Sequence, residues 1–206
     1  MILVRNLRLE PGEDLSRLSA KAAKKLRVST SDIAECRVVK RSLDARKKND
    51  IHYTCSAAVA LRAGEDKLLA RFAGKDVCAY TEPVYDIPHV EAASRPVVVG
   101  FGPAGMFAAL VLARAGARPI VLERGQDALS RKAAVDAFRA GGELDPESNV
   151  QFGEGGAGTF SDGKLNTGTH DKRMFWVLRE FAAHGAPESV TYDAKPHIGT
   201  DVLIDV

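Results

Sequence analysis

Three closely spaced glycines and one acidic residue are the residues whose types and spacing suggest a chemistry in this chain. Gly100, Gly102 and Gly105 form the pattern G-x-G-x-x-G, and Glu123 follows about 20 residues later. Glycines permit a tight turn and a close approach of backbone N–H groups to a ligand, and the unpaired N–H groups at a helix start attract phosphate. A carboxylate can accept hydrogen bonds from both hydroxyls of a ribose. Together these residues predict a site for the diphosphate and adenosine ribose of a dinucleotide.

The surrounding elements have the order that such a site requires. An apolar β-branched run, Val97 to Val99, precedes the glycines, an alanine-rich helix is expected from Met106 to Ala115, and a second strand runs from Ile120 to Leu122. A 2′-phosphate would meet the like charge of Glu123, so bound NADP is disfavoured. The wording GPAG and the ending VLERG resemble the FAD-binding version of the motif. The alternative is a strand–helix–strand unit in which the glycines serve packing alone.

A second glycine-rich stretch, LDPESNVQFGEGGAGTFSDGKLNTG, covers residues 144–168. This composition cannot build a core, but it can bring backbone N–H groups, hydroxyls and one lysine close to a flat or charged ligand. A flexible surface loop is the alternative, against which the spaced apolar residues Phe152, Phe160 and Leu165 argue. Five of its glycines fall within eleven positions, namely Gly153, Gly155, Gly156, Gly158 and Gly163, and they stand among the polar residues Thr159, Ser161, Asp162 and Lys164.

Both motifs, together with DAKPHIGTDVL at residues 193–203, resemble an uncharacterised family of bacterial FAD-dependent dehydrogenases. The resemblance covers essentially the whole chain. That family is in turn similar to the glutathione-reductase-like flavoproteins in its nucleotide fold. The resemblance implies an FAD-dependent oxidoreductase that passes a hydride or electrons between flavin and an unidentified small-molecule substrate, with NAD(P)H as a transient electron donor in the full-length protein.

The same resemblance assigns cofactor-binding roles by position. Glu123 would hold the adenosine ribose, and Arg124 would flank it. The pair of redox cysteines found in disulfide reductases is missing, so no dithiol mechanism is expected and no catalytic side chain is named. Lys164 and His197 are candidates near a flavin, with loop stabilisation as the alternative. The diphosphate would be lined by Gly100, Gly102, Pro103, Ala104 and Gly105, and the diphosphate or flavin ring would be approached by Gly156, Gly158, Thr159, Ser161 and Lys164.

The first ninety residues predict a separate small domain. Apolar residues at helical spacing follow Glu13 and Asp14, and period-two alternation marks the strands. The order βαββαβ is the ferredoxin-like arrangement, a fold that does not by itself name a function. The expected elements are a strand over Ile2–Leu9, a helix carrying Leu15, Leu18, Ala22 and Leu26, strands over Glu35–Asp44 and Ile51–Leu61, a helix over Glu65–Phe72 and a strand over Val77–Thr81.

We therefore predict an α/β protein with a ferredoxin-like domain over residues 1–82, a proline-containing linker over 83–96 and a Rossmann-type FAD-binding domain over 97–206. Further helices are expected over Leu129–Ala140, with Val135 and Phe138 inward, and over Lys172–His184. The final apolar run, Val202 to Val206, is expected to be a strand. Members of the resembled family are longer, so we expect the FAD-binding domain to be incomplete and the chain to be inactive alone.

Two other functions remain open at this point. One is a non-catalytic fragment with an incomplete nucleotide site. The other is an RNA- or protein-binding module that uses a basic cluster, although Tyr53 is the single aromatic residue on the strands that would stack bases. The basic cluster consists of Lys40, Arg41, Arg46, Lys47 and Lys48.

Composition limits the class of protein. The formal net charge is +2, with +5 in residues 1–90 and −3 in residues 91–206, so no strongly charged partner is implied. The three cysteines, Cys36, Cys55 and Cys78, form no metal-binding or redox spacing and are read as core thiols. Charges stand too early in the N-terminus for a signal peptide, and the most apolar window, Val97 to Ala113, contains glycines and a proline. We expect a cytoplasmic protein without a metal site, a membrane span or a nucleic-acid partner.

Overall fold

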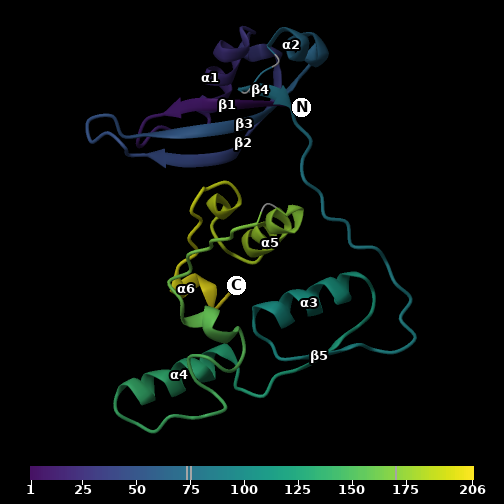
Figure 1. Ribbon diagram of the computed structural model, residues 1–206, viewed down its shortest axis with the longest axis vertical. Coiled ribbons are helices and arrows are strands. Elements are labelled where there is room, and N and C mark those ends of the chain that lie inside the picture. Colours follow the sequence, from purple (N-terminus) through teal and green to yellow (C-terminus); the bar gives the residue numbers. More distant parts are fainter. Residues whose placement is uncertain (73, 75, 170) are drawn as a thin grey trace. The chain divides into compact units, whose positions relative to one another are not determined.

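The computed structural model describes residues 1–72, 74, 76–169 and 171–206, and its contacts divide the chain into two compact units (Figure 1). The first unit consists of Met1–Pro83 together with Glu188–Pro196, and the second of Val84–Pro187 together with His197–Val206. The fold is mixed α/β, with an antiparallel sheet in the first unit and a small parallel sheet in the second. The contacts thus group Glu188–Pro196 with the first unit, although the expected domain division assigned it to the FAD-binding domain.

Four antiparallel strands in the order β2-β3-β1-β4 form the sheet of the first unit. Strand β1 is central, because it pairs with β3 on one side and with β4 on the other. Strands β2 and β3 are consecutive and adjacent, whereas the connections from β1 to β2 and from β3 to β4, which contain α1 and α2, each pass over one intervening strand. The elements are β1 (Ile2–Leu9), α1 (Arg17–Leu26), the 3₁₀ helix η1 (Thr30–Asp32), β2 (Ile33–Asp44), β3 (His52–Leu61), α2 (Glu65–Phe72) and β4 (Val77–Ala79).

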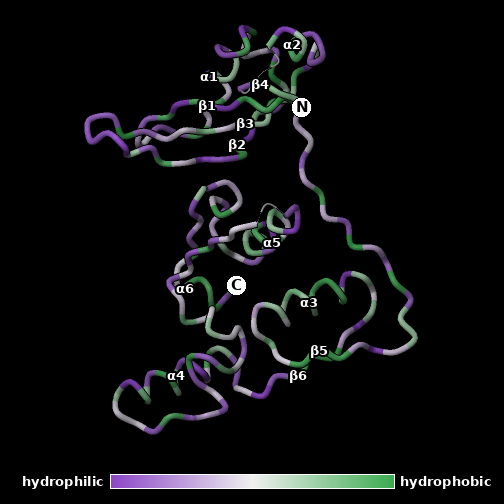
Figure 2. The backbone as a smooth tube through the Cα atoms, viewed as in Figure 1, coloured by the Kyte–Doolittle hydropathy of each residue, from purple (hydrophilic) through white to green (hydrophobic). Residues whose placement is uncertain are grey.

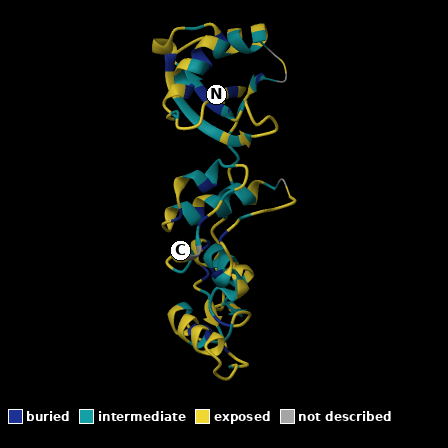
Figure 3. Cartoon of the chain, turned by 90° about the vertical axis from the view of Figure 1, so that its left-hand side faces the viewer, coloured by how far each residue is buried: buried dark blue, intermediate teal, exposed yellow. Residues whose placement is uncertain are grey.

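The core of the first unit lies between this sheet and helix α1. Leu18, Ala22 and Leu26 recur every four residues along α1, so they share one face, and all three are buried. Figure 3 shows that buried residues gather in the strands next to the N-terminus. Cys55, Ala57 and Val59 on one face of β3 are buried as expected, but Ala58 on the opposite face is buried as well, so the alternation is interrupted there. The other buried core residues are Ile2, Val4, Leu7, Leu9, Ala23, Ile33 and Val77.

The segment Glu188–Pro196 lies alongside β2 in the first unit. The N–H of Arg41 donates to the carbonyl oxygen of Tyr192 at 2.8 Å, and the N–H of Ala194 donates to the carbonyl oxygen of Arg41 at 2.9 Å. The Arg41 guanidinium also forms two hydrogen bonds with the Asp193 carboxylate, at 2.6 and 2.8 Å. The rings of Tyr53 and Tyr192 lie 5.2 and 5.3 Å from the guanidinium carbon. Both main chain and side chain therefore attach this segment to β2.

The second unit begins with a parallel strand pair joined by a helix. Strand β5 (Val97–Val99) pairs with β6 (Ile120–Leu122), and α3 (Pro103–Arg114) connects them. The helix starts three residues before the expected Met106, because Pro103 occupies its first position with Gly102 as N-cap. Proline suits that position, since its fixed φ is helical and no N–H is lost there.

The described part of the second unit also contains the helices α4 (Ala128–Arg139), α5 (Lys172–Ala183) and α6 (Thr200–Leu203) and the 3₁₀ helix η2 (Gly156–Phe160). Asp127 caps α4 and Asp171 caps α5, each by accepting hydrogen bonds from N–H groups of the first turn. The 3₁₀ helix η3 (Glu188–Thr191) belongs to the segment held by the first unit.

Two further expectations, one about secondary structure and one about burial, are wrong. The apolar run Val202–Val206 is not a strand, because Leu203 N–H donates to Gly199 O and Val206 N–H donates to Val202 O, which makes a helical turn. Phe138 is not inward, since it is 45% exposed, whereas Val135 on the same helix is buried as expected.

Aromatic packing attaches α5 to α3. The Phe107 ring lies edge-on to Trp176 at 5.8 Å and to Phe181 at 5.6 Å between centroids. Tyr85, in the segment expected as a linker, packs against Trp176 at 5.5 Å. Such edge-to-face pairs contribute stabilising free energy in addition to that gained from the apolar area that they bury. Tyr85 is therefore anchored within the second unit, which begins at Val84.

The two-stranded sheet of the second unit has little cover. Val99 is 82% exposed, and Figure 2 shows the hydrophobic character of β5.

Among the described residues, no helix has the length and apolar character needed to cross a bilayer.

Candidate functional site

The glycine turn joins β5 to the start of α3 in a geometry that needs its glycines. Gly100 has a φ of +91°, a left-handed conformation that glycine adopts without steric cost, and its N–H donates to Leu122 O at 2.7 Å. A Cβ on Gly105 would lie 2.0 Å from the carbonyl oxygen of Gly100. The helix can therefore lie close to the turn only with glycine there. The N–H groups of Ala104 and Gly105, in the first turn, have no partner within the helix.

Glu123 follows β6 and reaches back to the glycine turn. One carboxylate oxygen accepts a hydrogen bond from the N–H of Phe101 at 2.6 Å, and the other accepts one from the N–H of Gly125 at 2.8 Å. These backbone hydrogen bonds, with the one from Gly125 acting most strongly, hold the pKa of Glu123 below its usual value. The carboxylate is therefore ionised at neutral pH, and its two oxygens keep acceptor capacity for a further donor.

A cavity of about 540 Å³ opens between the glycine turn, the end of β6 and the second glycine-rich stretch. Its volume lies within the range of about 300–1,000 Å³ that is typical of small-molecule sites. Both motifs that the sequence singled out thus contribute to one cavity. The lining residues are Val99, Gly100, Gly102, Leu122, Glu123, Arg124, Gln151, Phe152, Gly153 and Gly156.

Arg124 lies at the wall of this cavity, on the side where the second stretch passes. Its guanidinium pairs with the Glu147 carboxylate at 2.6 Å and lies 5.7 Å from the centre of the Phe152 ring. Phe152 is 46% exposed, so an aromatic face and an arginine stand together at the opening.

The second glycine-rich stretch contacts the glycine turn directly. Gly155 N–H donates to Phe101 O at 2.8 Å, and a Cβ on Gly156 would lie 3.3 Å from Pro103 Cδ. A Cβ on Gly158 would lie 3.8 Å from Pro103 Cγ. The structure therefore brings two of the predicted residues, Gly156 and Gly158, against the start of α3.

Of the predicted residues of this stretch, Gly156 lines the cavity, whereas Gly158, Thr159, Ser161 and Lys164 do not. Thr159 is buried, and its hydroxyl donates to Glu154 O at 3.1 Å. The Ser161 hydroxyl accepts a hydrogen bond from Gly163 N–H at 3.1 Å. Lys164 is exposed and pairs with Asp162 at 2.5 Å, and its main chain bridges to His197, the other candidate. This bridge places Lys164 and His197, the two residues that the sequence analysis considered for the flavin, side by side.

Arg131 of α4 is a residue that the sequence analysis missed. Its side chain is fully buried and donates six hydrogen bonds, all to the stretch that covers the cavity. Four main-chain oxygens are among the acceptors, those of Asn149, Val150, Glu154 and Gly156. An arginine in a polar helix is ordinarily expected to lie on the protein surface. The glycine-rich composition of the stretch that it contacts was the one feature of the sequence that could have indicated its burial.

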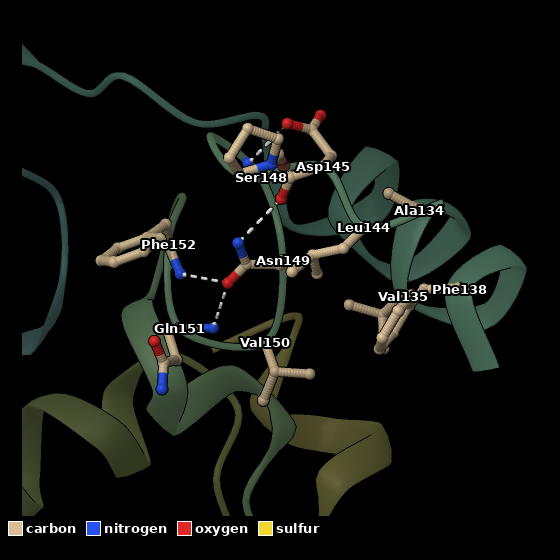
Figure 4. Close-up of a pocket in the computed structure, with 11 residues that line it drawn as sticks. Ala134, Val135, Phe138, Leu144, Asp145, Ser148, Asn149, Val150, Gln151 and Phe152 are labelled. Atoms are coloured by element: carbon tan, nitrogen blue, oxygen red, sulfur yellow. Dashed lines mark hydrogen bonds between the residues drawn. The ribbon is translucent and has the colours of Figure 1, made fainter. Parts of the chain in front are cut away.

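A second cavity, of about 450 Å³, lies between α4 and the same stretch (Figure 4). The side chain of Asn149 is already paired: its amide oxygen accepts from the N–H groups of Gln151 and Phe152, and its amide nitrogen donates to Asp145 O. The cavity is therefore largely apolar and offers few polar groups for a ligand. It is lined by Ala134, Val135, Phe138, Leu144, Asp145, Pro146, Ser148, Asn149, Val150, Gln151 and Phe152.

Comparisons with known proteins find matches in both units of the chain. The model of the family described as FAD binding domain matches residues 94–141, which contain the glycine turn, Glu123 and Arg131. Residues 1–60 match the domain of unknown function DUF8436. A protein of Clostridium beijerinckii, named only as an uncharacterized protein, is 48% identical over 207 residues, which cover 98% of this chain and 38% of the relative. The chain thus spans well under half the length of this relative. The match over residues 94–141 supports an FAD-binding flavoprotein domain in the second unit.

Proposed function

We propose that the second unit is a Rossmann-type domain that binds the adenosine diphosphate part of FAD in the 540 Å³ cavity. The observation that carries this proposal is that one cavity is lined by the glycine turn, the Glu123 carboxylate and the second glycine-rich stretch. The diphosphate lies at the start of α3, over Gly100, Gly102, Pro103, Ala104 and Gly105, and the ribose lies against Glu123.

Electrostatics support this orientation of the ligand. Helix α3 has 12 residues, and its first turn offers N–H groups and a partial positive charge to an anion. Each such contact contributes about 0.3–1 kcal/mol, so several must act together. The ionised Glu123 accepts hydrogen bonds from ribose hydroxyls and repels a 2′-phosphate. An unphosphorylated adenosine ribose, as in FAD, therefore fits this carboxylate.

Steric details also fit a diphosphate. Gly102 and Gly156 face each other at the cavity, since a Cβ on Gly156 would lie 3.4 Å from Gly102 Cα. Side chains at these two positions would fill the space that a diphosphate needs next to the helix start. Arg124 and Phe152 flank the adenosine side. We assign Gly158, Thr159, Ser161 and Lys164 to shaping the stretch that approaches the diphosphate and the flavin ring.

We further propose that the whole protein is an FAD-dependent oxidoreductase of the cytoplasm, with a ferredoxin-like domain formed by the first unit. When bound, the flavin supplies the transfer of a hydride or electrons, and the protein binds and orients it. The element order βαββαβ and the strand order β2-β3-β1-β4 support the ferredoxin-like assignment. The family match supports FAD and gives no support to a nicotinamide cofactor.

The basic cluster of the first unit favours this proposal over RNA binding. Arg41 is engaged by Asp193, and Arg46 pairs with Asp44 at 2.5 Å. The Arg41 guanidinium also lies 5.2 Å from the ring of Tyr53, the aromatic residue that would have to stack a base.

Titration of the 206-residue chain with ADP and with FAD tests the proposal. We expect saturable binding of both ligands, with flavin fluorescence quenched on binding, and competition between them. NADP should compete at least about tenfold less well than ADP, because the 2′-phosphate meets Glu123. If neither ADP nor FAD binds to the folded chain, the proposed function is wrong.

A further inference from the structure

We propose that Arg131 is a positioning residue for the nucleotide cavity, because its guanidinium gathers carbonyl oxygens of the second glycine-rich stretch on the side away from the ligand. The inference rests on the proposed function, since it concerns how the same cavity accepts an anionic diphosphate. Carbonyl oxygens repel phosphate and N–H groups attract it, so the direction in which each peptide points decides whether this wall of the cavity helps or hinders binding.

All six hydrogen bonds that the guanidinium donates go to this one stretch. Its distances are 2.8 and 3.2 Å to Asn149 O, 3.3 Å to Val150 O and 3.0 Å to Gly156 O, and it also donates to Glu154 O. Residues 149–156 therefore direct four carbonyls to one point inside the unit. A fully buried arginine is rarely tolerated without such a set of acceptors.

The geometry of the peptide bond fixes the direction in which the N–H groups of this stretch point. In a trans peptide, the N–H of a residue points away from the carbonyl of the residue before it. Because Glu154 O faces Arg131, Gly155 N–H must point the other way, and it donates to Phe101 O in the glycine turn. By the same rule, Ala157 N–H points away from Arg131, since Gly156 O faces it. The side of the stretch opposite Arg131 is thus the side that faces the glycine turn.

Three further contacts show that the stretch packs closely around this side chain. Gly153 has a φ of +111°, and a Cβ there would lie 2.3 Å from Arg131 Cδ. The Thr159 hydroxyl accepts from Arg131 Nη1 at 3.3 Å, and the Phe160 ring lies 4.9 Å from the guanidinium carbon. Gly153 lines the cavity, whereas Arg131 is not among its lining residues. Arg131 therefore acts on the ligand through the stretch.

The positive charge of Arg131 also contributes to the attraction of a diphosphate into the cavity. Burial lowers the pKa of Arg131, and the carboxylates of Glu123 and Glu154 oppose that shift. Arginine nevertheless stays charged in proteins, so a buried positive charge lies behind the wall of the cavity. Its attraction for a diphosphate is weakly screened, because the group is buried.

The test compares Arg131→Met and Arg131→Lys with the unchanged chain, using FAD titrations and competition by ADP and adenosine. For Arg131→Met we expect FAD and ADP affinities to fall by about tenfold or more, because the carbonyls lose their donor and turn towards the phosphates. Adenosine affinity should change by less than about twofold, since Glu123 still binds the ribose. Lysine keeps the charge but has three donors and no planar fork, so Arg131→Lys should lose an intermediate factor.

Arg139→Met is the matched control, because Arg139 lies on the same helix and is exposed. It should bind all three ligands as the unchanged chain does. Millimolar guanidinium chloride should restore ADP binding to Arg131→Ala, whereas the same concentration of sodium chloride should not. Rescue by the missing group would not occur if the substitution had simply unfolded the unit.

The outcomes separate the two proposals. If the unchanged chain binds neither FAD nor ADP, the proposed function fails and the inference fails with it. If the unchanged chain binds both but Arg131→Met loses ADP and adenosine by the same factor, Arg131 is merely structural and the inference is overturned. Should circular dichroism show that Arg131→Met does not fold, Arg131→Lys decides, and an ADP affinity equal to that of the unchanged chain overturns the inference.

Discussion

Arg114, the last residue of α3, forms two hydrogen bonds of 2.6 Å with the buried carboxylate of Glu180 on α5. The Arg114 guanidinium also lies 5.6 Å from the Trp176 ring. The opposite end of α3 carries the glycine turn, so this ion pair and the Phe107 contacts hold the helix whose start faces the cavity. A bidentate arginine–carboxylate pair fixes both distance and orientation.

Replacing Glu180 with glutamine should therefore destabilise the second unit. The change leaves Arg114 without its charged partner, and we expect a loss of about 1–3 kcal/mol in the free energy of unfolding. Urea denaturation followed by Trp176 fluorescence measures it, because that residue reports on the α3–α5 packing. Lys132→Met is the control, since Lys132 forms an exposed pair with Asp136, and no measurable change is expected. Equal stability of Glu180→Gln and the unchanged chain would contradict the role given to the pair.

The stability contribution of Glu123 should depend on pH. The pKa of Glu123 in the folded chain is lowered by the N–H groups of Gly125 and Phe101. A lowered pKa stabilises the fold above the unfolded-state value of about 4.3 and loses that effect as the pH falls through the folded-state pKa. We expect Glu123→Gln to cost about 1–2 kcal/mol at pH 7 and progressively less below pH ~4. Urea denaturation over this pH range checks it, and a cost that does not change with pH would refute the assignment.

Gly105→Ala should disturb the glycine turn. The added Cβ would lie 2.0 Å from Gly100 O, so α3 must move away from the turn. We expect ADP affinity to fall by at least about tenfold and unfolding to become easier by about 1–3 kcal/mol. Gly168→Ala is the matched control, because a Cβ there meets nothing within 4 Å and the residue has no positive φ. If both alanine variants bind ADP equally well, the helix start does not need the close approach described here.

Asp193→Asn should loosen the attachment of Glu188–Pro196 to β2. The Arg41 guanidinium loses a charged acceptor, and the pKa of Arg41, which the Asp193 side chain raises most, should move back towards its ordinary value. Hydrogen exchange measures the effect, because the Ala194 amide is bonded to Arg41 O at 2.9 Å and should exchange faster in the variant. Arg46→Met, which removes a more exposed pair on the same hairpin, should leave this amide unchanged. Unaltered exchange of Ala194 in Asp193→Asn would show that the main-chain bonds suffice.

The sequence allowed the local elements to be predicted where periodicity was strong. Leu18, Ala22 and Leu26 repeat at helical spacing and are buried together, and β5, α3 and β6 follow the glycine pattern in the expected order. The secondary structure of Val202–Val206 could not be predicted in the same way, because a short apolar run suits a strand or a helical turn equally. Contacts with the rest of the fold decide between the two, and here the run forms a helical turn.

The site was predictable where function depends on backbone geometry and less so where it depends on side-chain packing. Gly100 and Gly105 were expected to permit the turn and the close packing, and their φ and Cβ distances agree. Arg131 was missed because its burial depends on carbonyls from a stretch 18 to 25 residues later in the chain. Thr159 was assigned to the ligand, although its hydroxyl faces Glu154 O and Arg131. Long-range hydrogen bonds of this kind leave no local pattern.

The membership of Glu188–Pro196 in the first unit has a practical consequence for dissecting this protein. The polypeptide leaves the first unit near Pro83, returns at Glu188 and leaves again at Pro196, so the two units are interleaved along the chain. A protease cut between residues 84 and 96 would break one connection and leave the products associated under native conditions. Expressing residues 1–83 alone would strip the edge of β2 of its natural neighbour and expose unpaired main-chain groups, which invites self-association.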